Sequence, residues 1–71
     1  MIDKRKAMGD NIRRCRIAIG WSQEKLAVRS TLTSNYVSAL ERGSVTISVD
    51  NLRLIAKALG VSIIEFFEKE K

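Results

Sequence analysis

The chain has 71 residues, which suits one domain and lies near the lower size limit at which a single hydrophobic core holds a fold unaided. One cysteine and no histidine exclude an intramolecular disulfide and the common zinc sites, so packing has to stabilise the fold. The net charge is +5, and the excess lies in residues 1–42, which hold nine Lys or Arg against four Asp or Glu, whereas residues 43–71 hold four of each. A basic surface on one part of a small domain indicates a polyanionic partner.

Several classes of protein are disfavoured by what the sequence lacks. It has no motif that pairs a nucleophile with a base and no glycine-rich phosphate loop, so we expect neither an enzyme nor a bound cofactor or metal. No apolar run approaches the roughly 18 residues of a membrane span. The lone Cys15 suits a reducing compartment and is expected to be a small buried hydrophobe. We therefore expect one domain over residues 1–71, in a soluble cytoplasmic protein without membrane contact.

The first predicted helix covers about residues 3–19. Four apolar side chains recur in this segment at spacings of four, three and four residues, so they share one face of a helix. They are Met8, Ile12, Cys15 and Ile19. Gly20 is predicted to end the helix, because glycine readily adopts the left-handed conformation that follows a helix.

Two short helices are predicted next, and they nearly abut. The hydroxyl of Ser22 can cap a helix over residues 23–29, and that of Thr33 can cap a second helix that stops before Gly43. Apolar side chains supply the inner faces of these helices, and they are Leu26, Ala27, Val37 and Leu40.

Two further helices complete the predicted all-α, five-helix domain. Ser48 caps a fourth helix with a clear apolar stripe, which Gly60 closes. The stripe consists of Val49, Leu52, Ile55, Ala56 and Leu59. Ser62 and Glu65 have the spacing of a capping box, which opens a short fifth helix. That helix is apolar over an unusually wide arc, formed by Ile63, Ile64, Phe66 and Phe67.

The segment over residues 22–42 has the layout that a helix-turn-helix requires. In that motif the first helix crosses the phosphate backbone of DNA, and the second enters the major groove by its N-terminal end. The residues that read bases therefore have to be exposed on the first turns of the second helix. Ser34, Asn35, Ser38 and Ala39 fit that outer face.

The sequence resembles the lambda-repressor-like family, the Cro/CI or XRE class of regulators, from about residue 12 to residue 67. Gln23 matches the family's glutamine at the start of its second helix, and residues 40–43 (LERG) match its exit from the third. Ala27, Val37 and Leu40 match its packing positions, and residues 52–62 (LRLIAKALGVS) look like its following helix. The resemblance implies a compact five-helix domain that binds double-stranded DNA sequence-specifically and regulates transcription as a homodimer on a palindromic operator.

A narrower resemblance is to the controller proteins of restriction-modification systems. It rests on the spacing of residues 47–59 and on the terminal EFFE, and many short phage and plasmid repressors share the motif. An antitoxin or another protein-interaction module that uses the same fold is the alternative. We expect no small-molecule effector.

The motif assigns two groups of DNA contacts. Asn35 is the first candidate for base reading, because its amide can donate and accept toward the edge of adenine in the major groove. The predicted base contacts are Asn35, Ser34, Ser38, Tyr36, Ala39 and Thr33. Gln23 is expected to bind a phosphate together with the N–H groups at the start of its helix. The predicted phosphate contacts are Gln23, Arg42, Ser44, Thr46, Lys25 and Arg29.

Some of these assignments have a second interpretation. The hydroxyl of Thr33 can be occupied as a helix cap, and Tyr36 can pack on the domain as well as reach DNA. Residues 4–6 (Lys4, Arg5 and Lys6) form either a basic arm that follows the DNA or a frayed terminus.

The resemblance also implies a structural pair and points to one departure from the family. Arg16 and Glu41 correspond to an arginine and a glutamate that fasten the family's first helix to the end of its third. The family usually has glycine in the turn, where this chain has Thr31. A β-branched residue adopts the left-handed backbone at a cost of roughly 1–2 kcal/mol, so we expect the turn to take another conformation.

The C-terminal part, about residues 48–69, is predicted to hold the dimer interface. A single domain would leave part of the apolar surface of the fifth helix exposed, and such a patch indicates a partner. The predicted interface residues are Leu54, Ile63, Ile64, Phe66 and Phe67. A two-fold dimer through them would place two recognition helices roughly 34 Å apart, one turn of DNA.

Overall fold

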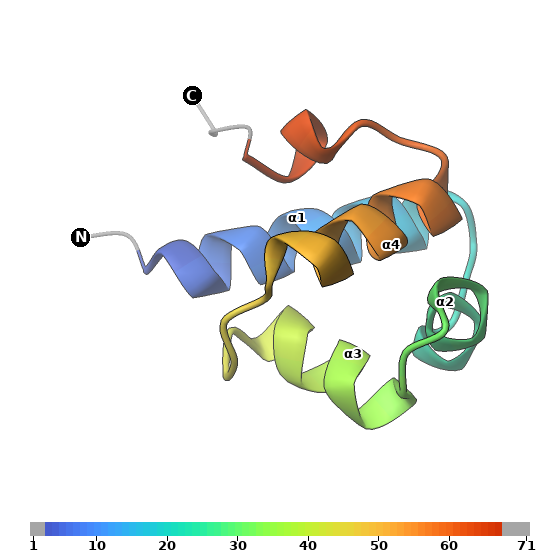
Figure 1. The fold of residues 1–71 in the computed structure, drawn as a ribbon, viewed down its shortest axis with the longest axis horizontal. Helices are drawn as coiled ribbons and strands as arrows, with labels where there is room; N and C mark the ends of the chain where they lie inside the picture. Colours follow the sequence, from blue (N-terminus) through green and yellow to red (C-terminus); the bar gives the residue numbers. More distant parts are fainter. Residues whose placement is uncertain (1–2, 68–71) are drawn as a thin grey trace.

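Four α-helices and one 3₁₀ helix follow one another in the computed structural model, which describes residues 3–67. They are α1 (Lys4–Ala18), α2 (Gln23–Ser30), α3 (Ser34–Arg42), α4 (Val49–Leu59) and η1 (Ile63–Phe67) (Figure 1). The predicted all-helical class is confirmed for these residues, none of which forms a strand. The predicted fifth helix differs, because η1 is a 3₁₀ segment of five residues.

Short hydroxyl side chains begin the three helices for which the sequence predicted them. Ser22, Thr33 and Ser48 each accept a hydrogen bond from the backbone N–H three residues later, at 3.0, 3.1 and 3.1 Å. Each bond satisfies a donor that the helix itself leaves without a partner. The starts of α2, α3 and α4 are therefore determined by local chemistry as well as by packing.

The start of η1 is built differently from the predicted capping box. The hydroxyl of Ser62 accepts from the N–H of Ile64 at 3.3 Å, and the N–H of Glu65 donates to the Ser62 carbonyl at 3.0 Å. A capping box would place the Glu65 N–H on the Ser62 hydroxyl instead. The prediction is wrong because the chain winds here with the tighter bonding of a 3₁₀ turn.

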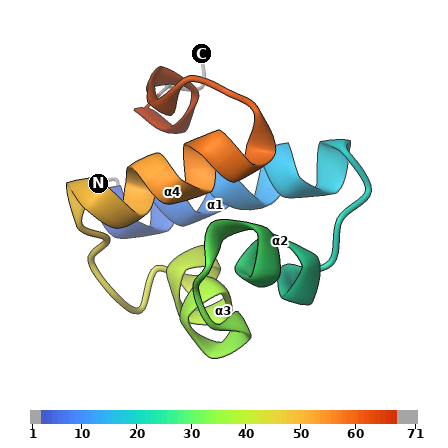
Figure 2. The same ribbon diagram turned by 45° about the vertical axis from the view of Figure 1, so that its right-hand side comes forward.

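The helices enclose one core. α2 and α3 lie on one side of α1, and η1 lies on the other side (Figures 1 and 2). Side chains from all five elements meet between them, namely Ile12, Leu26, Ala27, Val37, Leu40, Leu52, Ile55, Ala56, Leu59 and Phe66. Met8 and Cys15 pack against this core and are half-buried. Burial raises the pKa of the Cys15 thiol, and the carboxylate of Glu65 raises it further, so the thiol stays protonated at neutral pH.

Ile19 does not join the inner face of the first helix, contrary to the prediction. α1 ends at Ala18, and Ile19 is its C-cap with 46% of its surface exposed. Ile19 therefore lies outside the helix, and it does not share the inner face of α1 with Ile12. Gly20 follows with a φ of 75°, the left-handed conformation predicted for the helix end.

The contact between α1 and η1 is fastened by a buried amide. The side chain of Asn11 donates from Nδ2 to the carbonyl oxygen of Phe66 at 2.8 Å, and Nη2 of Arg14 donates to Asn11 Oδ1 at 2.6 Å. The Phe66 ring is 1% exposed and belongs to the core of this chain. The prediction that Phe66 lies at a dimer interface is therefore wrong, because η1 turns this ring inward.

Thr31 adopts the left-handed conformation that the sequence analysis expected the turn to avoid. Its φ and ψ are 62° and 29° at the C-terminal end of α2. In this conformation its N–H donates to the carbonyl of Val28 at 3.2 Å, and the N–H of Leu32 donates to that of Ala27 at 2.9 Å. These bonds pair carbonyls that the helix end would leave open, and they offset the cost of about 1–2 kcal/mol for a side chain in this region. The turn thus has the backbone of a glycine turn without the glycine.

A buried ion pair joins α1 to the end of α3. Nε and Nη2 of Arg16 donate to the two carboxylate oxygens of Glu41 at 2.6 and 2.9 Å, and Nη1 donates to the carbonyl of Trp21 at 2.6 Å. Arg16 is 9% exposed and Glu41 4%. The hydrogen bond to Glu41 raises the pKa of Arg16, so the guanidinium remains charged. The planar fork of arginine matches a carboxylate in two-point contact, which fixes the angle between the two helices.

Gly9 allows α1 and α3 to approach each other closely. A Cβ atom at this position would lie 2.2 Å from the carbonyl oxygen of Leu40 and 2.8 Å from that of Glu41. Both neighbours are backbone atoms of α3, which a side-chain movement cannot displace. The role of Gly9 is not visible in its local sequence, because it depends on a neighbour 31 residues away.

Substitution of Gly9 by alanine should test this close approach. Alanine is favoured over glycine inside a helix by about 1 kcal/mol, so helix propensity alone predicts a more stable protein. We expect the opposite, a loss of about 2–3 kcal/mol in the free energy of unfolding, because α1 and α3 must separate. Urea titration followed by circular dichroism measures the difference. An unchanged or raised stability would show that the helices do not pack at this distance.

Replacement of Glu41 by glutamine should expose the cost of an unpaired buried charge. The variant keeps the shape of the side chain and leaves the Arg16 guanidinium without its counter-charge, so we expect a loss of about 3–5 kcal/mol in the free energy of unfolding. Asp10→Asn is the control, because it breaks the exposed Lys6–Asp10 pair, whose atoms are 2.7 Å apart. That pair should contribute no more than about 1 kcal/mol. Equal losses in both variants would contradict the structural role of the buried pair.

Candidate nucleic-acid interface

The outer face of α3 presents the side chains predicted to read bases. Asn35 is exposed, and its amide forms no hydrogen bond with another described residue. Ser34 and Ala39 are half-buried beside it. Thr33 is exposed, but its hydroxyl accepts the N–H of Tyr36 and serves as the helix cap. The structure therefore leaves Asn35 with the most freedom to contact another molecule.

Ser38 and Arg42, which were predicted to contact DNA separately, contact each other. Nη1 of Arg42 donates to the Ser38 hydroxyl at 2.6 Å across one turn of α3. Arg42 remains exposed, and its guanidinium has further donors. The pair places one cation along the exposed flank of α3.

Tyr36 packs against the domain, as one of its two interpretations required. It is half-buried against the core, and its hydroxyl accepts a hydrogen bond from Asn51 Nδ2 on α4 at 3.1 Å. Asn51 was missed by sequence reasoning, since nothing in its spacing distinguishes it from a solvated surface asparagine. The bond ties the flank of α3 to the first turn of α4.

Gln23 is the first residue of α2 and lies at the junction of three helices. Its Nε2 donates to Glu41 Oε1 at 3.0 Å, so it joins the network of Arg16. The side-chain amide has a second N–H, and the first backbone N–H groups of α2 have no partner within the helix. These donors lie at the same end of the helix, where the helix dipole favours an anion.

The other residues predicted to contact phosphates lie in two places. Lys25 and Arg29 of α2 lie over the ring of Trp21, at 5.8 and 5.6 Å from its centroid, which is within cation–π range. Ser44 and Thr46 are exposed in the loop between α3 and α4. The structure does not gather these four residues at one point.

The basic residues near the N-terminus are part of α1. Residues 4–6 form its first turn, whose N-cap is Asp3, so the interpretation as a frayed terminus is wrong for them. Lys4 and Arg5 line a small hollow with Thr46 of the α3–α4 loop. The start of α1 and this loop therefore form one continuous edge next to the end of α3.

Within residues 3–67 no group of three or more His, Cys, Asp or Glu is placed to hold a metal ion. In the same part of the chain no helix is long and apolar enough to cross a membrane.

The sequence is similar to those of known transcriptional regulators. The chain is 43% identical over 60 residues to the Neisseria hypothetical transcription factor of Neisseria meningitidis, covering 84% of the chain and 57% of that protein. It therefore spans little more than half the length of that relative. It is also 43% identical to the control protein C.BamHI of Bacillus amyloliquefaciens, over 80% of the chain and 72% of that protein.

A solved structure agrees with the sequence relatives. The restriction-modification controller protein C.AhdI from Aeromonas hydrophila superposes with a TM-score of 0.86 at 39% identity, covering 87% of this chain and 94% of that one. The family model described as helix-turn-helix matches residues 12–66, which include α2, α3 and α4. This chain therefore belongs to the helix-turn-helix family, of the XRE type that its sequence indicated.

Proposed function

We propose that the protein is a sequence-specific DNA-binding transcriptional regulator, not an enzyme, and that it binds a palindromic operator as a homodimer. The observation that supports this most directly is the network of Arg16, Glu41 and Gln23, which fixes α3 relative to the start of α2. With the two helices held at one angle, a phosphate at the start of α2 and bases opposite α3 can be contacted together. Asn35 then faces the major groove with an unoccupied amide.

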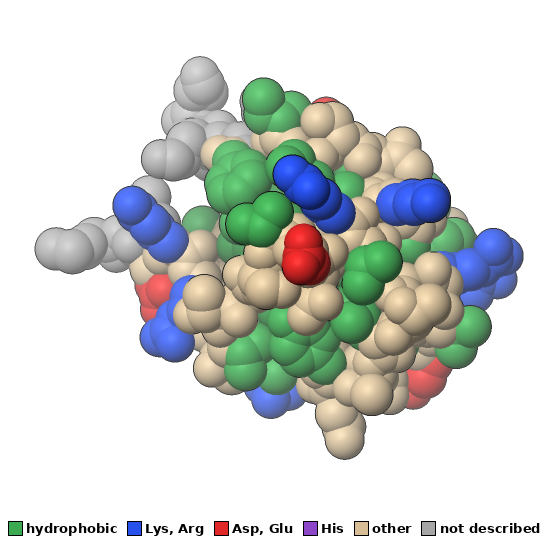
Figure 3. All heavy atoms as spheres, in the orientation of Figure 1, with side chains coloured by type: hydrophobic (Ala, Val, Ile, Leu, Met, Phe, Trp, Pro, Cys, Tyr) green, Lys and Arg blue, Asp and Glu red, His purple; other side chains and the backbone are tan. Residues whose placement is uncertain are grey.

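The dimer interface that we propose is smaller than the sequence indicated. Leu54, Ile64 and Phe67 are 38%, 65% and 54% exposed, whereas Ile63 is half-buried against the core. Figure 3 shows one group of hydrophobic side chains on the upper part of the molecule, where Figure 1 places α4 and η1, and a second group lower down, where Figure 1 places α3. An apolar surface of this kind favours a two-fold contact with a second copy. The occupancy of an operator would then depend on protein concentration through dimerisation.

Among regulators of this family, we propose a controller of a restriction-modification system. Two relatives of this kind match it, C.BamHI at 43% identity and C.AhdI at 39% identity. The match with C.AhdI extends over 94% of that protein, so the similarity is not limited to the helix-turn-helix segment. No small-molecule effector enters this proposal.

The division between base and phosphate contacts can be tested on two residues. Asn35→Ala should relax the preference at one base pair and cost about 1–3 kcal/mol of binding free energy on the preferred duplex. Gln23→Ala should weaken binding to all sequences alike. Fluorescence anisotropy with a duplex selected from a random pool and with a scrambled duplex measures both variants. Equal losses on both duplexes for both variants would contradict the division.

The proposed dimer surface can be separated from the core by two phenylalanine variants. Phe67→Ser should lower the sedimentation coefficient toward that of a monomer and leave the thermal unfolding of the monomer nearly unchanged, because the side chain is exposed. Phe66→Ala should cost about 3–5 kcal/mol of folding free energy, since its ring fills the core. A wild-type protein that sediments as a monomer at micromolar concentration would contradict the proposed dimer.

A further inference from the structure

A hollow that borders the predicted phosphate contacts Gln23 and Arg42 opens where α1, the start of α2 and the end of α3 meet. It is lined by Lys6, Asp10, Arg13, Gln23, Glu41 and Arg42. It is open to solvent, and its volume is about 430 Å³. The hollow therefore has room for a phosphate group and its hydration shell, next to the amide of Gln23.

The charges around the hollow favour an anion. Glu41 is neutralised by Arg16, and Asp10 by the ammonium group of Lys6 at 2.7 Å. Arg42 is held by the Ser38 hydroxyl. Arg13 is exposed, and no ion pair or hydrogen bond joins its guanidinium to another residue within 3–67. A guanidinium offers five N–H donors in a plane, a geometry that suits phosphate oxygens.

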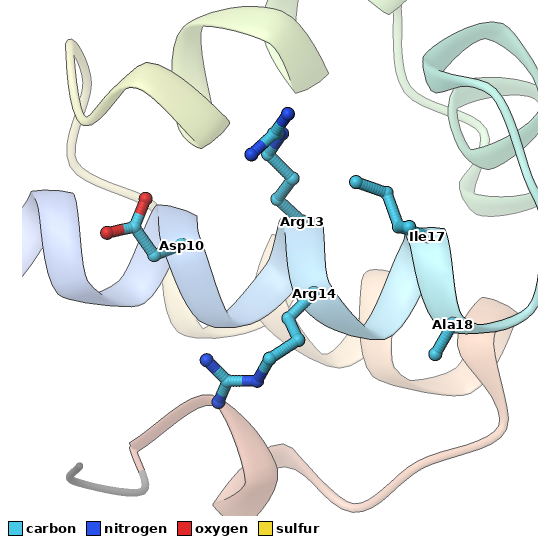
Figure 4. A pocket seen from close by; sticks show the side chains of 5 residues that line it. All are labelled: Asp10, Arg13, Arg14, Ile17 and Ala18. Atoms are coloured by element: carbon cyan, nitrogen blue, oxygen red, sulfur yellow. The ribbon is translucent and has the colours of Figure 1, made fainter.

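The direction of Arg13 is set by α1. Figure 4 shows that Arg13 extends toward the side of the helix on which α2 and α3 lie, whereas Arg14 extends toward η1. Arg14 is engaged there with Asn11 Oδ1 at 2.6 Å. Of these two neighbouring arginines, only Arg13 therefore faces the side of the molecule that would meet DNA.

We propose that Arg13 binds the same DNA phosphate as Gln23 and the start of α2, so that the DNA interface extends onto the middle of α1. This inference rests on the proposed function. The phosphate would receive hydrogen bonds from the α2 N-terminus on one side and from the Arg13 guanidinium on the other. Such a contact positions the recognition helix along the backbone and carries no base specificity.

The salt dependence of binding tests this contact. Arg13→Gln should lower the log–log slope of affinity against salt concentration by about 0.9, the value for one phosphate contact on duplex DNA. Across a four-fold rise in salt, the variant should thus lose about 3.5-fold less affinity than the wild type. The loss of affinity at low salt should be the same on a selected duplex and on a scrambled one. Arg53→Gln on α4 is the matched control, because it removes the same exposed charge elsewhere and should leave the slope unchanged.

Ethylation interference is a second measurement, and a change in net charge alone would not alter its pattern. Ethylation of one phosphate in each half-site should weaken binding by the wild type more than binding by Arg13→Gln, which keeps only the Gln23 and α2 contacts to that phosphate, and Arg53→Gln should keep the wild-type pattern. Thermal unfolding of both variants should match the wild type, since both side chains are exposed. If Arg13→Gln showed the salt slope and the ethylation-interference pattern of the wild type, the inference would be overturned and the proposed function would remain intact. Absence of DNA binding by the wild type would overturn both.

Discussion

The two-point contact between Arg16 and Glu41 is the interaction on which the DNA-facing geometry depends. It joins the middle of α1 to the last turn of α3, and through Gln23 it includes the first residue of α2. A buried pair of this kind adds little net stability, because both charges must be removed from water. The pair fixes the relative orientation of the helices, since a two-point contact between a guanidinium and a carboxylate forms only over a narrow range of angles between the two groups. Three helices that are separate in sequence therefore share one rigid junction.

Much of the fold could be predicted from the sequence, and the reasons are local. Caps at Ser22, Thr33 and Ser48 and the apolar spacing within the helices depend on residues only a few positions apart. Where two local tendencies competed, prediction failed. Thr31 was expected to avoid a left-handed backbone, yet the hydrogen bonds at the end of α2 outweigh its side-chain preference.

The candidate site and the packing of η1 were predictable only in part, because they depend on contacts between residues distant in sequence. Asn11 reaches a carbonyl 55 residues away, and the partner of Asn51 lies on another helix. Arg13 and Arg14 are indistinguishable in sequence, and only the packing of α1 separates a side chain that faces α2 and α3 from one that faces η1. The inward orientation of Phe66 likewise follows from the 3₁₀ winding of η1, which residue composition does not determine.

The bond between Asn11 and the Phe66 carbonyl has a consequence for the geometry of an operator. It holds η1 against α1, and the Arg16–Glu41 pair holds α1 against α3, so both contacts act on one stiff helix. In a dimer of the proposed kind, the distance between the two recognition helices would then be nearly invariant. Differences in spacing between half-sites would have to be absorbed by the duplex, through bending or twisting of its central base pairs. Central base pairs without a protein contact would then be selected for their deformability.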